Sequence, residues 1–111
     1  MKILYEINIQ VRKEKEIDWV TWISDDHIPA ICEVARVSDA FLIKIDGPDS
    51  DTFSAYRVMF YFDDKSDLTH YLDNFAAPLR DDHIKKFGND VSIQRQYGIV
   101  MKWFEITAPK G

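Results

Sequence analysis

Apolar and polar residues alternate at the start of the chain, and further along the apolar residues recur at helical spacing. From Ile3 to Val11 the odd positions are apolar and the even positions are mostly polar. This period of two predicts a strand with one buried face. Winding the next stretch at about 100° per residue gathers an inward stripe, which predicts a helix. The stripe consists of Ile17, Val20, Ile23, Ser24, His27, Ile28 and Ile31.

The same two periods return in the second half of the chain. Residues 39–45 and 53–62 are typical of strands, and the turn-forming sequence DGPDSDT joins them as a hairpin loop. Ser66 can cap a second helix, and Gly88 is suited to end it. The apolar stripe of that helix consists of Leu68, Tyr71, Leu72, Phe75, Leu79 and His83. A final strand is expected over residues 91–106, with a bulge or bend near Tyr97 and Gly98.

Each predicted helix contains a proline. Pro29 lacks the N–H that would bond to the carbonyl of Asp25, so the first helix should kink or restart near His27. Pro78 should distort the second helix in the same way. Functional side chains often gather at breaks of this kind.

The element order is therefore strand, helix, strand, strand, helix, strand. With right-handed crossovers this order gives a ferredoxin-like βαββαβ sandwich of the α+β class. Its four antiparallel strands take the order 4-1-3-2, and both helices cover one face of the sheet. With 111 residues in total, we expect a single domain over residues 1–111.

The other face of the sheet should also be covered, because the third strand is apolar on both sides. Met59 and Tyr61 lie on the face away from the helices. A contiguous exposed apolar patch is unusual on a monomer, so we expect a homodimer joined sheet to sheet through this open face. The remaining residues expected there make its middle partly polar. They are Leu4, Glu6, Asn8, Lys44 and Arg57.

Composition and charge exclude several classes of protein. The chain is 46% hydrophobic and 14% aromatic, which excludes a disordered class. Its formal net charge is -5, and its Lys and Arg residues are scattered among acids, so we expect no nucleic-acid partner. The N-terminal stretch carries Glu6 and Asn8, so we expect neither a signal sequence nor a membrane span.

The single cysteine limits the metal and redox chemistry of the chain. Cys32 cannot form an intrachain disulfide or a multi-cysteine zinc site, and we expect its thiol to be buried in an apolar helical stretch. A reducing cytoplasm fits this composition. There is no glycine-rich phosphate loop in the sequence, and we expect no cofactor.

The string DDHI occurs twice, at residues 25–28 and 81–84. Together the two copies offer four carboxylates and two imidazoles, which would suit a transition metal. Each copy is expected to end its own helix, however, and the two helices are antiparallel in this topology. The copies should then lie on the order of 20 Å apart at opposite ends of the domain, so we expect no metal site.

Several stretches resemble a known family. They are WISDDHIPAI, the pair Tyr71 and Leu72, APLRDDHIKKFG and VSIQR, and they resemble an uncharacterised bacterial family, the domain of unknown function numbered 4286. That family is similar to the dimeric α/β barrel proteins, which include antibiotic-biosynthesis monooxygenases, EthD-like proteins and muconolactone isomerases. In EthD-like members a Trp, a later His and a Pro close the first helix, as Trp22, His27 and Pro29 do here. The resemblance implies the fold and the dimer but no particular reaction.

His27 is the main candidate for a functional side chain. On the inward stripe beside the proline, an imidazole can transfer a proton or donate to an oxyanion. The alternative is a helix-terminal histidine that bonds a backbone carbonyl. Arg95 interrupts an apolar alternation, so it either holds an anionic ligand or forms a salt bridge to an acidic helix end. Trp22 either edges a ligand pocket or packs at the dimer boundary.

These features predict a cytoplasmic homodimer that binds a small, partly apolar molecule between helices and sheet. The hypothesis requires an elongated cavity reached by Trp22, His27, Tyr5 and Arg95. His27 would then serve a cofactor-independent enzyme in an acid-base or polarising role. The alternative is a non-catalytic dimeric module that recognises another protein and has no such cavity. His83, which no proline follows, is expected to be structural or exposed.

Overall fold

The computed structural model describes residues 1–47 and 50–107. The first half contains β1 (Ile3–Arg12), η1 (Lys13–Lys15), α1 (Glu16–Trp22), the π-helical segment η2 (Ile23–His27), α2 (Ile28–Val34) and β2 (Val37–Lys44). The second half contains β3 (Phe53–Phe62), α3 (Lys65–Asn74), α4 (Ala76–Phe87), η3 (Gly88–Asp90) and β4 (Val91–Ile99). Within these residues no helix combines the length and the apolar character needed to cross a membrane.

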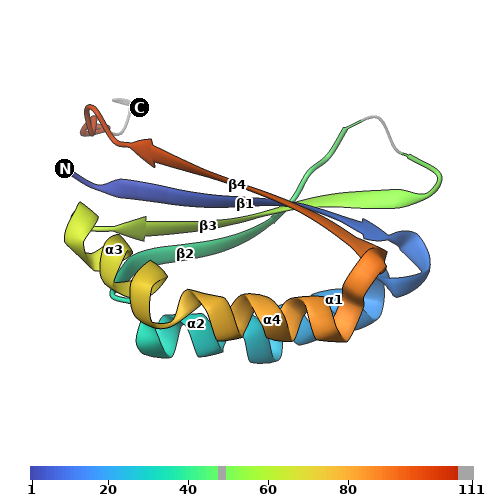
Figure 1. Cartoon of the computed structure of the whole chain (residues 1–111). Coiled ribbons are helices and arrows are strands. Elements are labelled where there is room, and N and C mark those ends of the chain that lie inside the picture. The colour runs from blue at the N-terminus through green and yellow to red at the C-terminus, as the bar shows by residue number, and fades with distance from the viewer. Residues whose placement is uncertain (48–49, 108–111) are drawn as a thin grey trace.

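The strands form one antiparallel sheet in the order β2-β3-β1-β4, and the helices cover one of its faces (Figure 1). β1 pairs with β3 along its whole length, from Ile3 opposite Phe62 to Arg12 opposite Phe53. The other side of β1 pairs with β4. Read from the β4 edge, the order is 4-1-3-2, so the predicted ferredoxin-like fold is confirmed. The predicted hairpin between β2 and β3 is also present, although residues 48–49 of its loop lie outside the described residues.

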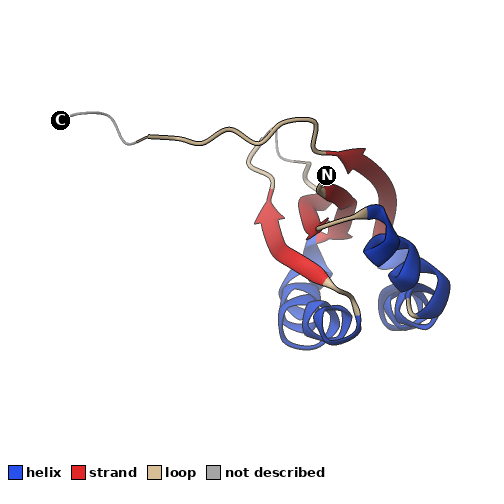
Figure 2. Ribbon diagram, turned by 90° about the vertical axis from the view of Figure 1, so that its left-hand side faces the viewer, coloured by secondary structure: helices blue, strands red, loops and turns tan. Residues whose placement is uncertain are grey.

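The core lies between the sheet and the helix layer. Odd-numbered residues of β1 and even-numbered residues of β3 face the helices and are buried there. The helices form two columns side by side on this face (Figure 2). Val11, Trp19, Phe60 and Phe62 each have 0% of their surface exposed. Burial of aromatic and branched side chains of this size supplies most of the stability of such a domain.

The inward face of the first helical segment differs from the predicted stripe. Ile17 is 82% exposed, whereas Trp19 is completely buried. Trp19 and Ile23 are four residues apart and stack along one face of the helix, so the large indole takes the inward position and Ile17 falls outside it. Cys32 is also exposed, contrary to expectation, because its neighbour Ile31 takes the buried position.

Both predicted helix breaks are present, and each proline lies in the first turn of a restarted helix. Pro29 lies in the first turn of α2, directly after the π-helical turn that ends at His27. α3 ends at Asn74 and α4 begins at Ala76, so Pro78 lies in the first turn of the new helix. A first-turn proline leaves no helical hydrogen bond unmade, because that N–H has no partner within the helix. The first helical segment therefore continues past His27 to Val34.

The last strand ends earlier than predicted. β4 stops at Ile99, and residues 100–107 form neither helix nor strand. β4 is an edge strand that pairs only with β1, which begins one residue after Lys2. The ladder therefore ends where the Val100 N–H donates to the Lys2 carbonyl at 2.9 Å. Pairing runs through Tyr97 and Gly98 without the predicted bulge.

The sheet face that no helix covers carries the predicted mixture of apolar and polar residues. Leu4 lies opposite Tyr61, and Glu6 lies opposite Met59. Lys44 is an exception to the prediction. Its partner across the strands is Tyr56, on the helix side, and the Lys44 ammonium lies 3.2 Å from the Glu16 carboxylate.

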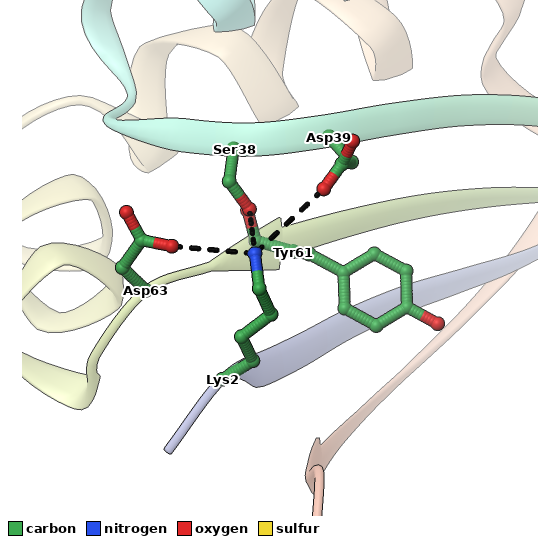
Figure 3. A network of polar contacts seen from close by, with 5 residues as sticks. All are labelled: Lys2, Ser38, Asp39, Tyr61 and Asp63. Carbon is green, nitrogen blue, oxygen red and sulfur yellow. Dashed lines mark hydrogen bonds and ion pairs between the residues drawn. The ribbon is translucent and has the colours of Figure 1, made fainter. Parts of the chain in front are cut away.

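Lys2 ties the start of β1 to β2 and to the residue that follows β3 (Figure 3). Its ammonium lies 3.0 Å from the Ser38 hydroxyl, 3.3 Å from Asp63 and 3.8 Å from Asp39. The Ser38 hydroxyl in turn donates to the backbone carbonyl of Tyr61. Exposed contacts of this kind contribute little stability one by one, so their main effect is to fix where the strand ends lie.

Candidate functional site

The two DDHI copies meet in the helix layer, so the predicted separation is wrong. The ring centroids of His27 and His83 are 5.2 Å apart. The prediction failed because it assumed that each copy ends its helix. α2 extends the first helical segment beyond His27, so His27 lies within the segment, beside the antiparallel α4 (Figure 1).

Both histidines belong to a buried aromatic cluster. The Trp22 indole stacks on the His27 ring, with centroids 4.5 Å apart and planes 20° from parallel. Phe87 packs against Trp22 at 5.4 Å. The Trp19 indole N–H donates to Nε2 of His83 at 3.0 Å. Since that nitrogen accepts, the neutral His83 ring carries its proton on Nδ1.

Burial keeps both imidazoles neutral. The pKa of His27 is lowered from 6.5 to about 4, mainly by loss of hydration; the nearby Asp82 carboxylate opposes this shift, and the Arg95 charge adds to it. Burial likewise lowers the pKa of His83 to about 4, aided by His27 and Arg95. A neutral imidazole with so low a pKa is a weak base but still donates an N–H to a carbonyl or oxyanion. The environment therefore favours a polarising role for His27 over proton abstraction.

A cavity of about 20 Å³ lies between the helices and the sheet, large enough for about one water. Its walls include Tyr5, His27 and Arg95, together with Arg80 and His83. Trp22 is absent from the lining. The structure thus brings three of the four predicted site residues to one cavity, but that cavity is compact where an elongated one was expected.

Trp22 instead lines an open groove of about 470 Å³ between the two helical segments. His27 and Leu79 line both the groove and the cavity, so they form the wall that separates the two spaces. The groove carries charges of both signs. Its charged residues are Asp26, Asp82, Lys85 and Lys86.

Two arginines bring positive charge to the cavity. Arg95 lies opposite Ile7 and faces the helix layer, as predicted. Arg80, on α4, donates to the Tyr5 hydroxyl at 3.0 Å. In both guanidinium groups the buried Nε has no hydrogen-bond partner among the described residues. Within residues 1–47 and 50–107, no carboxylate lies within 4.0 Å of either group, so the salt bridge considered for Arg95 does not form there.

The sequence model of a family described as a domain of unknown function, DUF4286, matches residues 2–97. The chain belongs to the DUF4286 family. The resemblance proposed from the sequence is thereby confirmed. No curated protein matches this DUF4286 chain.

Solved structures resemble the DUF4286 chain in fold. An ethyl tert-butyl ether (EthD) family protein from Bacillus halodurans is 16% identical, with a TM-score of 0.67 over 89% of this chain and 99% of its own. A putative antibiotic biosynthesis monooxygenase from Bacillus cereus is 9% identical, with a TM-score of 0.68 over 98% and 100%. A dimeric ferredoxin-like protein from an uncultured marine organism is 8% identical, with a TM-score of 0.62 over 93% and 98%. At these identities the likeness shows the fold alone.

The described part of this DUF4286 protein contains no group of three or more His, Cys, Asp or Glu side chains that could hold a metal ion. His83 already uses Nε2 to accept from Trp19, and its ring faces that of His27. Guanidinium and imidazole N–H groups are donors suited to an oxygen-bearing group.

Arg80 is the residue of the DUF4286 site that the sequence analysis missed. It lies three residues before His83 on α4, so both side chains project from nearly the same helix face. That spacing was visible in the sequence. The signal is weak, because a charged residue next to Asp81 and Asp82 is usually solvated.

Proposed function

We propose that this DUF4286 protein is a cytoplasmic homodimer that binds a small, partly apolar molecule between its helix layer and its sheet. The observation that carries the proposal is the pair of guanidinium groups, Arg80 and Arg95, that line one cavity without a carboxylate partner among the described residues. An unpaired charge in a partly buried place is unfavourable for stability. A ligand that supplies a negatively charged partner would explain why both guanidinium groups are left without a carboxylate.

His27 would act on the bound molecule as a hydrogen-bond donor. Its ring lies at the wall between the cavity and the open groove, where a ligand in the cavity would contact it. Its pKa of about 4 keeps the ring neutral near pH 7. In a cofactor-independent enzyme such a neutral imidazole would polarise a carbonyl or stabilise a developing oxyanion.

Two features support the homodimer. The open face exposes Phe41 (48%) and Ile43 (39%) next to Met59 and Tyr61. The segment after β4 leaves the sheet as a loop (Figure 2). It exposes further large apolar side chains. They are Met101, Trp103, Phe104 and Ile106.

The apolar segment lies on the side of the open face, because the Trp103 ring meets Tyr61 edge-on at 6.2 Å. A second protomer packed on that face would cover the segment as well. Sedimentation equilibrium tests the assembly: we expect a mass of twice 13.0 kDa, and a monomeric mass at micromolar concentration would contradict it.

Native mass spectrometry of freshly purified protein tests ligand binding. We expect a retained small-molecule mass in the wild type and in a His70→Ala control, whose residue lies outside the cavity. The fraction of protein that retains this molecule should be smaller in His27→Ala. A wild type without any retained mass, or a His27→Ala variant that loses stability but keeps its ligand, would contradict the proposal.

The second candidate function is a non-catalytic dimeric module that recognises another protein. The exposed Trp103 and Phe104 (65% each) are the observation that favours it. In that case Trp103→Ala would abolish partner capture in solution, whereas His27→Ala and Arg95→Gln would leave capture unchanged. Loss of the small-molecule mass in those two cavity variants separates the first function from this one.

A further inference from the structure

We infer that Arg80 and Arg95 form a carboxylate-binding site, and that the ligand is an amphipathic carboxylic acid whose apolar part lies in the groove between α3 and the end of β4. This inference rests on the proposed function and specifies its ligand. Three independent features support it: two arginines without a carboxylate partner share one cavity, the charge around that cavity is positive, and an apolar groove lies beside it.

The five arginines of the chain divide into two groups. Arg12, Arg36 and Arg57 each have a carboxylate within 4.0 Å, at Asp90, Asp67 and Glu6 respectively. Arg80 and Arg95 have none in residues 1–47 and 50–107, and each has a buried Nε without a partner. The chain therefore neutralises its arginines elsewhere and leaves unpaired the two that share a cavity.

Among the residues that the structure describes, no carboxylate lines the cavity itself. Its lining contains the two guanidinium groups, neutral imidazoles, tyrosines and apolar side chains. The charge of Arg95 reaches several of these groups: it adds to the lowering of the pKa of His27 and His83 by burial, and it partly opposes the rise that burial causes in the pKa of Tyr71. An anion is favoured in such surroundings, and a carboxylate matches the paired N–H groups of a guanidinium geometrically.

Three tyrosines separate this cavity from an apolar groove. Tyr5 lies at the centre of the wall, with Tyr97 stacked on it at 5.2 Å and Tyr71 tilted against it at 6.4 Å. Tyr5 and Tyr71 line the cavity, whereas Tyr97 lines the groove on the other side. Tyr97 is 52% exposed. Tyr5 and Tyr71, each 2% exposed, must move together with Tyr97 for one ligand to occupy both spaces.

The groove beyond Tyr97 has a volume of about 600 Å³ and a largely apolar lining. Its apolar residues come from β1, α3 and β4: Ile3, Leu68, Leu72 and Ile99. The cavity itself has room for about one water, so a carboxylate enters it only when the surrounding side chains move apart. A molecule that fills both spaces must therefore carry its charge at one end and a hydrocarbon body at the other, as a medium-chain fatty acid does.

Isothermal titration calorimetry with decanoate, below its micellar concentration, tests the inference. We expect saturable binding of decanoate, at least about tenfold weaker binding of the neutral decanol, and an at least about tenfold loss for Arg95→Gln or Arg80→Gln. The exposed Arg36→Gln serves as the matched control and should bind decanoate like the wild type. Acetate, which lacks the hydrocarbon body, should bind weakly to all of them.

Thermal unfolding of the same variants without ligand distinguishes binding from a structural role. Removal of an unpaired charge should leave the Tm of Arg95→Gln unchanged or higher, whereas loss of a structural contact would lower it. Equal affinity for decanol and decanoate would overturn the carboxylate site but leave the proposed ligand space standing. Absence of any decanoate binding, or a lowered Tm in Arg95→Gln with unchanged affinity, would also overturn the inference.

Discussion

Acidification should destabilise this protein well above the pH at which carboxylates titrate, because two neutral histidines are buried side by side. His27 and His83 each have a pKa of about 4 in the folded chain, against 6.5 for an unperturbed imidazole. Between these two values the unfolded chain binds more protons than the folded chain. The stability that depends on these two neutral histidines is therefore fully present above pH 6.5, and it is lost as the pH falls from 6.5 towards 4.

The size of the effect follows from the two pKa values. Lowering the pH from about 7.5 to about 5 removes about 2 kcal/mol for each histidine, or about 4 kcal/mol for the pair. This loss is a large fraction of the total stability of a small domain, which is about 5–15 kcal/mol. The rings are close enough for one charge to oppose the other, so the two protonations should not be independent.

Urea unfolding followed by tryptophan fluorescence, at fixed protein concentration and several pH values, measures this loss. The pH values should stay above about 5. The lowered pKa of Glu16 gives a second contribution to stability, which is lost only at more acidic pH, so above this limit the histidines account for the change. The double variant His27→Gln/His83→Gln should show a much flatter profile. His70→Gln, outside the aromatic cluster, is the control. A flat wild-type profile, or the same slope in the double variant, would refute the reasoning.

Two further predictions concern the frame around the site. Tyr56→Phe removes the hydrogen bond of 2.5 Å from the tyrosine hydroxyl to the Glu16 carboxylate, so urea unfolding should show a loss of about 1–3 kcal/mol; an unchanged midpoint would contradict it. Gly88→Ala should lower the free energy of unfolding by about 1–2 kcal/mol, since Gly88 has φ of +50° and the added methyl meets no atom. A variant as stable as the wild type would show that this backbone strain is absent.

The sheet was predictable because apolar residues recur with a period of two in its central strands. β1 and β3 place apolar residues on every second position, and the observed register keeps those positions on the helix face. With right-handed crossover connections, the order of strands and helices along the chain is then compatible with one sheet topology. The end of β4 was not predictable in the same way. It depends on where β1 begins as a partner, and the apolar residues Met101 and Trp103 extend beyond that point.

The site was only partly predictable. Helical periodicity shows which side of a helix a residue faces, but it does not show which residues of two neighbouring helices lie at the same level. His27 and Arg95 were recognised as inward-facing, and the structure brings both to one cavity. The meeting of His27 with His83 was missed because Pro29 was taken as a helix end. Instead, a π-helical turn lies directly before the helix that contains Pro29. The helical segment therefore continues beyond His27 alongside α4.

The role of Arg80 and Arg95 as the anchor of an anionic ligand is the central claim, and NMR of their side-chain Nε–H groups tests it most directly. Addition of decanoate should shift the Nε–H resonances of Arg80 and Arg95, which have no hydrogen-bond partner among the described residues, and saturate at one ligand per protomer. Arg36 and Arg57, already paired with carboxylates, should not respond. Shifts confined to these exposed arginines, or no shifts at all, would contradict the account.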